Sequence, residues 1–191
     1  MKIKGNVLAA RVAYVKEHFG EAGLESVLQN LPADDQAVLR GLITNVGWYA
    51  FEIGKRLDQA IVRILGKGDL RIFEEIGAAS AKKNLTTVHT LFLDKGNPQG
   101  FMSRAHVIYR SYYDKGRRQY VATGSTSGVM TTYDAETFSS FDCMTIIGWY
   151  KEALSMCGAT DVVMVEEVCR AKGGECCRYR VSWSGVRAST P

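Results

Sequence analysis

The sequence predicts an α+β fold: a helical N-terminal part, then a β-β-α-β-β segment whose antiparallel sheet packs against helices. Two observations predict it. Before about residue 117, apolar side chains recur at the three- and four-residue spacing of amphipathic helices. After it, Thr, Val and Tyr become frequent, and glycine-containing turns separate the strand-like stretches, which is typical of hairpins.

Each helix of the N-terminal part is predicted from an apolar stripe and a start or stop signal. In chain order the stripes are 8–19, ended by Gly20; 24–31, ended by Pro32; 38–42, capped by Asp34 or Asp35; 57–65, ended near Gly66-Lys67-Gly68; 70–76, capped by Asp69; and 101–112, after Pro98.

The C-terminal part is predicted as two hairpins around one helix. The first hairpin pairs 118–123 with 126–133 through Gly124-Ser125, and the second pairs 161–170 with 176–183 through Lys172-Gly173-Gly174. The helix between them is capped by Ser139 or Ser140, ends at Gly158, and carries an apolar stripe formed by Cys143, Ile147, Tyr150 and Leu154.

Length and composition limit the classes of function. The 191 residues predict a single domain over 1–184 with a loose tail over 185–191. The charge, 24 − 20 = +4, is too small to indicate nucleic-acid binding, and the basic cluster Lys115, Arg117 and Arg118 is interpreted as a solvated turn. No stretch approaches the roughly 20 apolar residues of a membrane span. The start lacks a secretory segment, so we expect a cytoplasmic protein.

The cysteines are the most informative side chains. Five are too few for a disulfide framework, and three of them flank the second hairpin turn. Side chains alternate between the two faces of a strand. One face of 176–183 is apolar and carries Cys177, Tyr179, Val181 and Trp183; the other carries Cys176, Arg178, Arg180 and Ser182. We therefore expect Cys177 to point into the core and Cys176 to be exposed.

Cys143 lies on the apolar face of its helix, where it can meet Cys169 and Cys177. Three thiols with the nearby Glu166 carboxylate suit Zn²⁺, which takes four ligands, and a zinc ion with four protein ligands is structural. The alternatives are buried cysteines that act as small core residues and a vicinal disulfide between Cys176 and Cys177. Cys157 is interpreted as an ordinary thiol.

The segment 166–178 resembles the C-terminal signature of 4-vinyl reductase domains, small-molecule-binding domains of the NO signalling/Golgi transport ligand-binding fold. That signature is a Glu, a Cys three residues on, a glycine-containing turn and a Cys eight residues further, with another Cys upstream; the chain matches it throughout. The resemblance implies one zinc ion at Cys143, Glu166, Cys169 and Cys177. The whole chain also resembles a paralogous family of myxobacterial proteins, on Lys4-Gly5, Ala10-Arg11, Gly20-Glu21-Ala22-Gly23 and Trp48-Tyr49.

The same resemblance implies a ligand pocket, since family members that sense aromatic compounds recognise them with a His and a Trp. We expect an apolar pocket for a small apolar or aromatic ligand where helices meet the sheet. Its predicted residues are Trp48, Phe101, His106, Tyr109, Tyr112 and Tyr120. The alternative is an ordinary aromatic core.

Haem is the competing ligand. Haem-NO-binding domains have a similar length and also begin with helices, and they need a proximal His and a Tyr-x-Ser-x-Arg motif. The histidines here are His18, His89 and His106, and the nearest match to the motif, 109–113, lacks the final Arg. Haem is therefore not expected.

No Ser/His/Asp arrangement, P-loop or G-x-G-x-x-G motif indicates an enzyme. The sequence is interpreted as a non-catalytic, cytoplasmic sensory or regulatory module with a structural zinc site. It would signal through a protein partner and form a homodimer through its N-terminal helices. The alternative is a dimerising interaction scaffold without metal or ligand, like related folds in TRAPP complexes.

Overall fold

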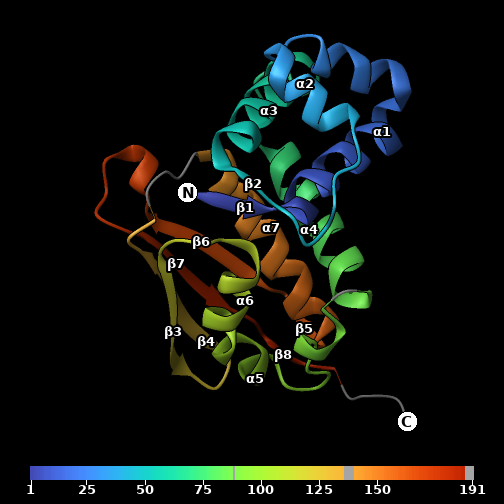
Figure 1. Cartoon of the computed structure of the whole chain (residues 1–191). Coiled ribbons are helices and arrows are strands. Elements are labelled where there is room, and N and C mark those ends of the chain that lie inside the picture. The colour runs from blue at the N-terminus through green and yellow to red at the C-terminus, as the bar shows by residue number, and fades with distance from the viewer. Residues whose placement is uncertain (88, 136–139, 188–191) are drawn as a thin grey trace.

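One helix, α7 (Ser140–Met156), runs through the centre of the molecule between the N-terminal helices and a four-stranded sheet (Figure 1). A computed structural model describes residues 1–87, 89–135 and 140–187. The N-terminal part contains β1 (Lys2–Lys4), α1 (Gly5–Leu28), α2 (Ala33–Arg40), β2 (Trp48–Ala50), α3 (Phe51–Ile64) and α4 (Arg71–Thr86). A short connection then carries η1 (Thr90–Phe92), α5 (Pro98–Ser103) and α6 (Ala105–Tyr112).

The sheet has the order β3-β4-β7-β6, with every neighbouring pair antiparallel. Its strands are β3 (Arg117–Gly124), β4 (Ser127–Tyr133), β6 (Val163–Val168) and β7 (Cys177–Ser182); η2 (Arg170–Lys172) lies in the β6–β7 turn, and β5 (Ala159–Thr160) pairs with β8 (Gly185–Val186). The α+β fold predicted from the sequence is confirmed.

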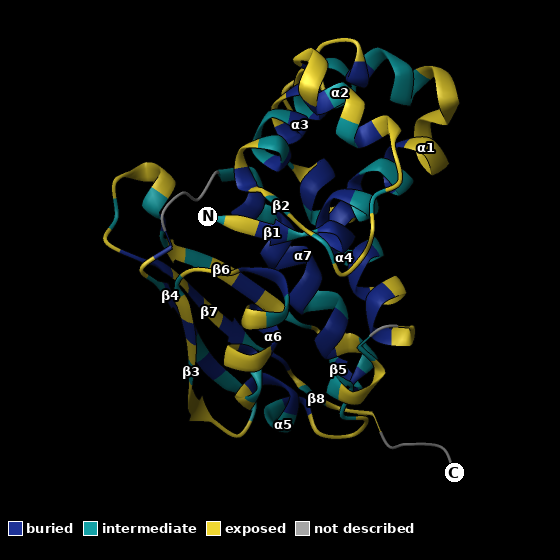
Figure 2. Ribbon diagram, in the orientation of Figure 1, coloured by how far each residue is buried: buried dark blue, intermediate teal, exposed yellow. Residues whose placement is uncertain are grey.

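One face of the sheet is buried against α6 and α7, and the other is open. Met130, Tyr179 and Val181 are buried on the inner face, whereas Val121 and Val163 are exposed. Figure 2 shows the buried residues gathered along α7 and the exposed ones at the outer end of α1. The register places Arg118, Thr132 and Cys177 opposite one another across three strands. All three are buried, so this row places polar side chains and a thiol in the core.

The close approach of α4 and α7 depends on two glycines. A Cβ at Gly77 would lie under 3.0 Å from the backbone of Thr145 and Trp149, and a Cβ at Gly148 under 3.0 Å from the backbone of Glu74. Real Cβ atoms do not approach backbone this closely. The two helices therefore cross at a distance that only glycine allows, which fixes the N-terminal part against α7.

Several predicted boundaries are wrong in detail. The stripes 8–19 and 24–31 form one helix, α1, kinked at Gly20, where φ is 70°. The third helix ends at Arg40, and Leu42 is exposed. The stripe 101–112 is divided into α5 and α6 at Arg104. The short strands β1 and β2 carry no sequence signal of their own and form by pairing with each other.

Three further expectations concern single positions. Arg118 is not part of a solvated turn, because it is buried on the inner face of β3. Gly185–Val186, placed in the predicted tail, form β8, while residues 188–191 lie outside the described part of the chain. Ser140 begins α7, and Ser139 also lies outside the described residues. None of the described helices combines the length and apolar character that crossing a bilayer requires.

Candidate functional site

A small cavity of about 50 Å³ lies where α1, α4, α6, α7 and β3 meet. Its walls are mostly apolar or aromatic, but three charged side chains also reach it. The lining residues comprise Val7, Arg11, Ser80, Ile108, Tyr109, Tyr112, Tyr113, Arg118, Asp142, Thr145, Ile146, Trp149 and Tyr150. The charged members come from three different elements, so folding itself assembles this constellation.

Arg11 forms the centre of a buried ion network beside the cavity. Its Nε lies 2.5 Å from Asp58 Oδ1 and its Nη2 lies 3.0 Å from Asp58 Oδ2, a two-point contact between α1 and α3. Its Nη2 also lies 3.6 Å from Asp142 Oδ1. Burial opposes the charge of Arg11, but the Asp58 carboxylate outweighs it and raises the Arg11 pKa. Arg11 is therefore a fixed cation of the core.

Asp142 faces the same cavity from the first turn of α7. The Tyr113 hydroxyl donates to its carboxylate at 3.1 Å and 3.2 Å. Burial raises the pKa of Asp142 to about 6, against the opposing effect of Arg11. Burial likewise raises the pKa of Tyr113 well above its ordinary value. The phenol is therefore the donor in this contact, with no tendency to ionise at neutral pH.

Arg118 is the second buried cation. Its Nε donates to Thr132 Oγ1 at 2.9 Å and its Nη1 to Tyr150 Oη at 3.4 Å. Its guanidinium carbon lies 4.8 Å from the centre of the Tyr109 ring and 5.5 Å from that of Tyr150. The Nη2 atom is buried and has no hydrogen-bond partner. Arg118 thus brings an unsatisfied donor to the wall of the cavity.

A second constellation brings together Cys143, Cys169 and Cys177. Cys143 Sγ lies 3.7 Å from Cys169 Sγ and 3.9 Å from Cys177 Sγ, and all three sulfurs lie within 4.8 Å of one another. All five cysteines of the chain are free thiols. Three buried sulfurs at this separation can act as ligands of one thiophilic metal ion.

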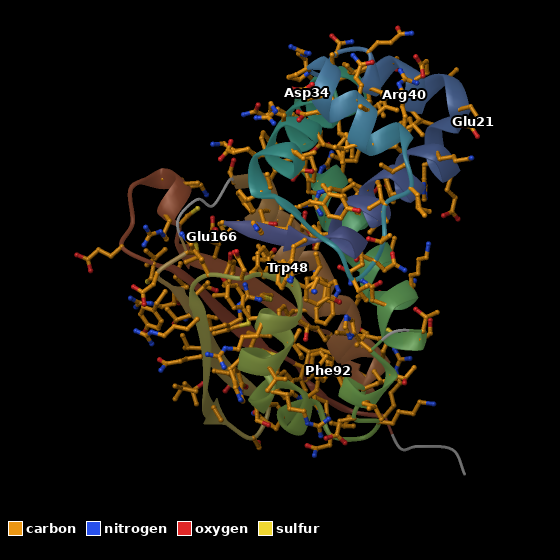
Figure 3. The ribbon with its side chains drawn as sticks, viewed as in Figure 1. Glu21, Asp34, Arg40, Trp48, Phe92 and Glu166 are labelled. Atoms are coloured by element: carbon orange, nitrogen blue, oxygen red, sulfur yellow. The ribbon has the colours of Figure 1, made fainter. Side chains whose placement is uncertain are left out.

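Glu166, the fourth predicted ligand, lies beside these thiols but outside the group whose atoms are within 4.8 Å of one another. Figure 3 labels it on β6. Its Oε2 accepts from Lys172 Nζ at 2.8 Å, while its buried Oε1 has no hydrogen-bond partner. Burial and, after it, the neighbouring Glu166 carboxylate raise the pKa of Cys169. The free Oε1 therefore belongs to a carboxylate in contact with the thiol cluster.

The thiols are not equivalent. A hydrogen bond with Cys143 and another from the Arg170 backbone N–H favour the thiolate of Cys177, and its pKa falls to about 7. The pKa of Cys143 is raised by the same contact. Cys177 is therefore the thiol of the pair that ionises first. The predicted strand alternation holds for Cys177–Ser182, but Cys176 is only 6% exposed, so its predicted exposure is wrong.

The predicted pocket residues are dispersed. Tyr109 and Tyr112 line the cavity. Phe101 lies behind the wall and packs on Trp149 and Tyr150. Tyr120 on β3 donates to Gln99 Oε1 on α5, and His106 is exposed on α6. Trp48, labelled in Figure 3, is 42% exposed, and Lys4 Nζ lies over its ring. These last three side chains do not line the cavity.

The sequence interpretation missed Arg11, Arg118 and Asp142. Arg11 carried a usable signal, because it interrupts an apolar helix stripe. Arg118 belongs to the basic cluster that the sequence predicts as a solvated turn, although alternation along β3 places it on the other face of the strand from the exposed Arg117. Asp142, next to Cys143, gave no periodic signal. Sequence periodicity identifies the elements that meet at a cavity more readily than the polar residues inside it.

Comparison with known proteins places the fold. No family model matches the chain, and no curated protein matches it in sequence. Similar solved structures are H-NOX domains. An Fe(II) unliganded H-NOX protein from K. algicida matches with a TM-score of 0.72 and 12% identity, over 98% of this chain and 100% of that one. A structure that probes haem distortion in the H-NOX family matches with a TM-score of 0.72 and 12% identity, over 98% of each chain. The chain therefore has an H-NOX-like fold.

These findings correct two expectations. The predicted membership of the 4-vinyl reductase domains is wrong, because the structural neighbours are H-NOX domains and no family model matches. The predicted cofactor, structural zinc with haem not expected, is also wrong. The neighbours include structures concerned with haem, so they favour haem over zinc.

A haem site needs an iron ligand and enough space, and the residues at the cavity can be compared with both requirements. None of the three histidines lines the cavity, whose 50 Å³ is far below the roughly 300 Å³ at which cofactor pockets begin. His89 approaches it most nearly: its ring centre lies 5.3 Å from that of the cavity-lining Tyr112, and its buried Nε2 has no hydrogen-bond partner. Haem does not fit this arrangement, since the aromatic side chains occupy the space.

Proposed function

We propose that this chain is a non-catalytic sensing module whose small ligand binds in the central cavity. The observation that carries the proposal is the position of the cavity. Residues of α1, α4, α6, α7 and β3 line it, so a bound molecule would touch the helical part, the central helix and the sheet at once. A ligand at such a junction can shift the packing of these elements if it binds their two arrangements differently.

The chemistry of the lining supports binding rather than catalysis. Among the described residues, its side chains include no His or Cys. Of its two aliphatic hydroxyls, that of Ser80 accepts from Asn84 and that of Thr145 donates to the Phe141 carbonyl oxygen, so neither contacts a base. A nucleophile needs an adjacent base to act. The likeness to H-NOX domains supports the same proposal at the level of the fold.

The test of the sensing proposal is ligand binding with a cavity-filling variant. Thermal shift and ligand-observed NMR would screen haem and small molecules, with a Soret absorption band as the direct readout for haem. Val7→Leu adds bulk to the cavity wall, whereas Val12→Leu makes the same change on α1 outside the lining. We expect Val7→Leu alone to lose binding. A screen without any binder, or equal loss in both variants, contradicts the proposal.

The three-thiol cluster supports a second proposal, that Cys143, Cys169 and Cys177 bind one thiophilic metal ion with Glu166 beside them. The thiols come from α7 and from both ends of the β6–β7 turn, so the ion would join these elements. Elemental analysis of purified protein tests it. We expect Cys177→Ser to lose the metal and Cys176→Ser, one residue away and outside the cluster, to keep it. Absence of metal from the unmodified protein contradicts it.

Location and partners complete the proposal. We infer a cytoplasmic site of action, because a reducing compartment keeps five cysteines free. A sensing module also needs a partner to receive its signal. Leu42, Val46 and Trp48 are exposed near α2 and β2 and favour an interaction there, either between two copies of the chain or, as the second candidate function, in a scaffold without ligand. Light scattering of the wild type and Leu42→Ser distinguishes a monomer from a homodimer formed there.

A further inference from the structure

We propose that the central cavity binds a small oxyanion of three or four non-hydrogen atoms, such as formate, nitrite, nitrate or acetate, and that Arg118 is the residue that holds it. This inference rests on the proposed sensing function and specifies its ligand. It follows from the environment of Arg118, the charges around it and the size of the cavity.

Arg118 is a buried cation without an anion. It is 4% exposed, and in the described part of the chain it contacts two neutral oxygens, of Thr132 and Tyr150, but forms no ion pair. A guanidinium has five N–H donors, and these two contacts leave most of them unused. Burial of an unpaired charge is strongly unfavourable, which is why a buried arginine is usually paired with an anionic group.

The other charges at the cavity have partners. Arg11 is held by Asp58 in a two-point contact, and Asp142 accepts from Tyr113 and lies 3.6 Å from Arg11. Arg118 is near enough to Asp142 to oppose the rise of its pKa, but among the described residues no carboxylate forms an ion pair or hydrogen bond with Arg118. The Tyr109 and Tyr150 rings lie against its guanidinium. The guanidinium edge that includes the unpartnered Nη2 is therefore the part available to a ligand.

The size of the cavity selects the ligand. One water needs about 10–15 Å³ of such space, so about 50 Å³ holds roughly three or four non-hydrogen atoms. A benzene ring is too large for this volume, so the aromatic ligand predicted from the sequence does not fit the cavity. Two oxygens of a planar oxyanion match the spacing of guanidinium N–H groups. Apolar walls, among them Ile108 and Ile146, would strengthen that contact by excluding water.

The experiment compares acetate with acetamide, its neutral isostere, by isothermal titration calorimetry on the full chain. We expect acetate to bind saturably and acetamide to bind about ten-fold more weakly or worse, because the charge-assisted contact is lost. Arg118→Gln should abolish the preference for acetate. Arg117→Gln should keep it, since Arg117 is the neighbouring arginine, is exposed and lies over Tyr133 at 4.3 Å.

The outcomes separate this inference from the sensing proposal. If Arg118→Gln does not fold, Val7→Leu provides the test, because it keeps Arg118 but should lose acetate binding. Equal binding of acetate and acetamide would overturn the oxyanion assignment and leave the sensing function intact. Failure of formate, nitrite, nitrate and acetate to bind would also overturn it. If the screen of neutral molecules and haem were negative as well, both proposals would fall.

Discussion

Single residues in this molecule matter most where they carry charge into the core. Arg11 and Asp58 are 3% and 2% exposed, so neither of them reaches bulk solvent if the other is removed. Such a pair adds little net stability compared with apolar residues of the same shape. Removing one partner, however, leaves the other as an unpaired buried charge, which destabilises the fold. The sequence signalled this pair only through one arginine on an apolar stripe, because its partner lies 47 residues away on α3.

Asp58→Asn is therefore expected to destabilise the fold by about 3–5 kcal/mol, since Arg11 would stay buried with a weaker partner. Urea unfolding measures the loss. The matched control is Glu25→Gln, which removes the carboxylate from the exposed Arg40–Glu25 pair and should change the midpoint little. Equal midpoints for the two variants would show that the buried pair is not fixed as described.

His89 predicts a pH dependence. Burial lowers its pKa below the ordinary 6.5, and its ring packs against those of Phe92 and Tyr112. The unfolded chain then takes up a proton more readily than the folded one, so stability present above pH 6.5 is lost as the pH falls below it. His89→Phe keeps an aromatic ring and removes the proton site. Its free energy of unfolding should fall less than that of the wild type between neutral pH and about pH 5; parallel curves would contradict this.

Elements in this fold are positioned by a few close contacts. The stripes of the sequence predicted most helices and both hairpins, because periodicity of 3.6 or 2 residues follows directly from which face is buried. They did not predict the α4–α7 crossing, since Gly77 and Gly148 carry no periodic signal. Nor did they predict that α1 continues past Gly20, because a kink and a stop look alike in a sequence.

Gly148→Ala is expected to separate α7 from α4 and to cost about 1–3 kcal/mol or more, because the new methyl group would meet the Glu74 backbone, which cannot turn aside. Thermal unfolding measures the effect. Gly54→Ala on α3 is the control, since its Cβ would meet the movable end of the Ile3 side chain, at 2.9 Å. A larger loss in Gly54→Ala than in Gly148→Ala would refute the close-packed crossing.

At the scale of the whole molecule, the fold was predictable and the ligand was not. The order of helices and hairpins identified the α+β class, and strand alternation placed Cys177 inward. The spacing of Cys143, Cys169 and Cys177 indicated a cluster that the structure brings together. The same spacing could not decide the family or the cofactor. The cavity depends on which side chains fill the space between helices and sheet, and that is a property of three-dimensional packing.

The thiol cluster connects local chemistry to global stability, because it joins α7 to the β6–β7 hairpin. A metal ion that binds only the folded protein stabilises it by RT ln(1 + [L]/Kd), about 2.7 kcal/mol at one hundred times Kd. A chelator should therefore lower the Tm of the wild type and of Cys176→Ser. Cys177→Ser should begin with a lower Tm and not respond, because its site is already broken. Differential scanning calorimetry with and without chelator measures all three. An equal response of Cys176→Ser and Cys177→Ser would place the metal elsewhere, while no response in the wild type would reduce the three thiols to a packed part of the core.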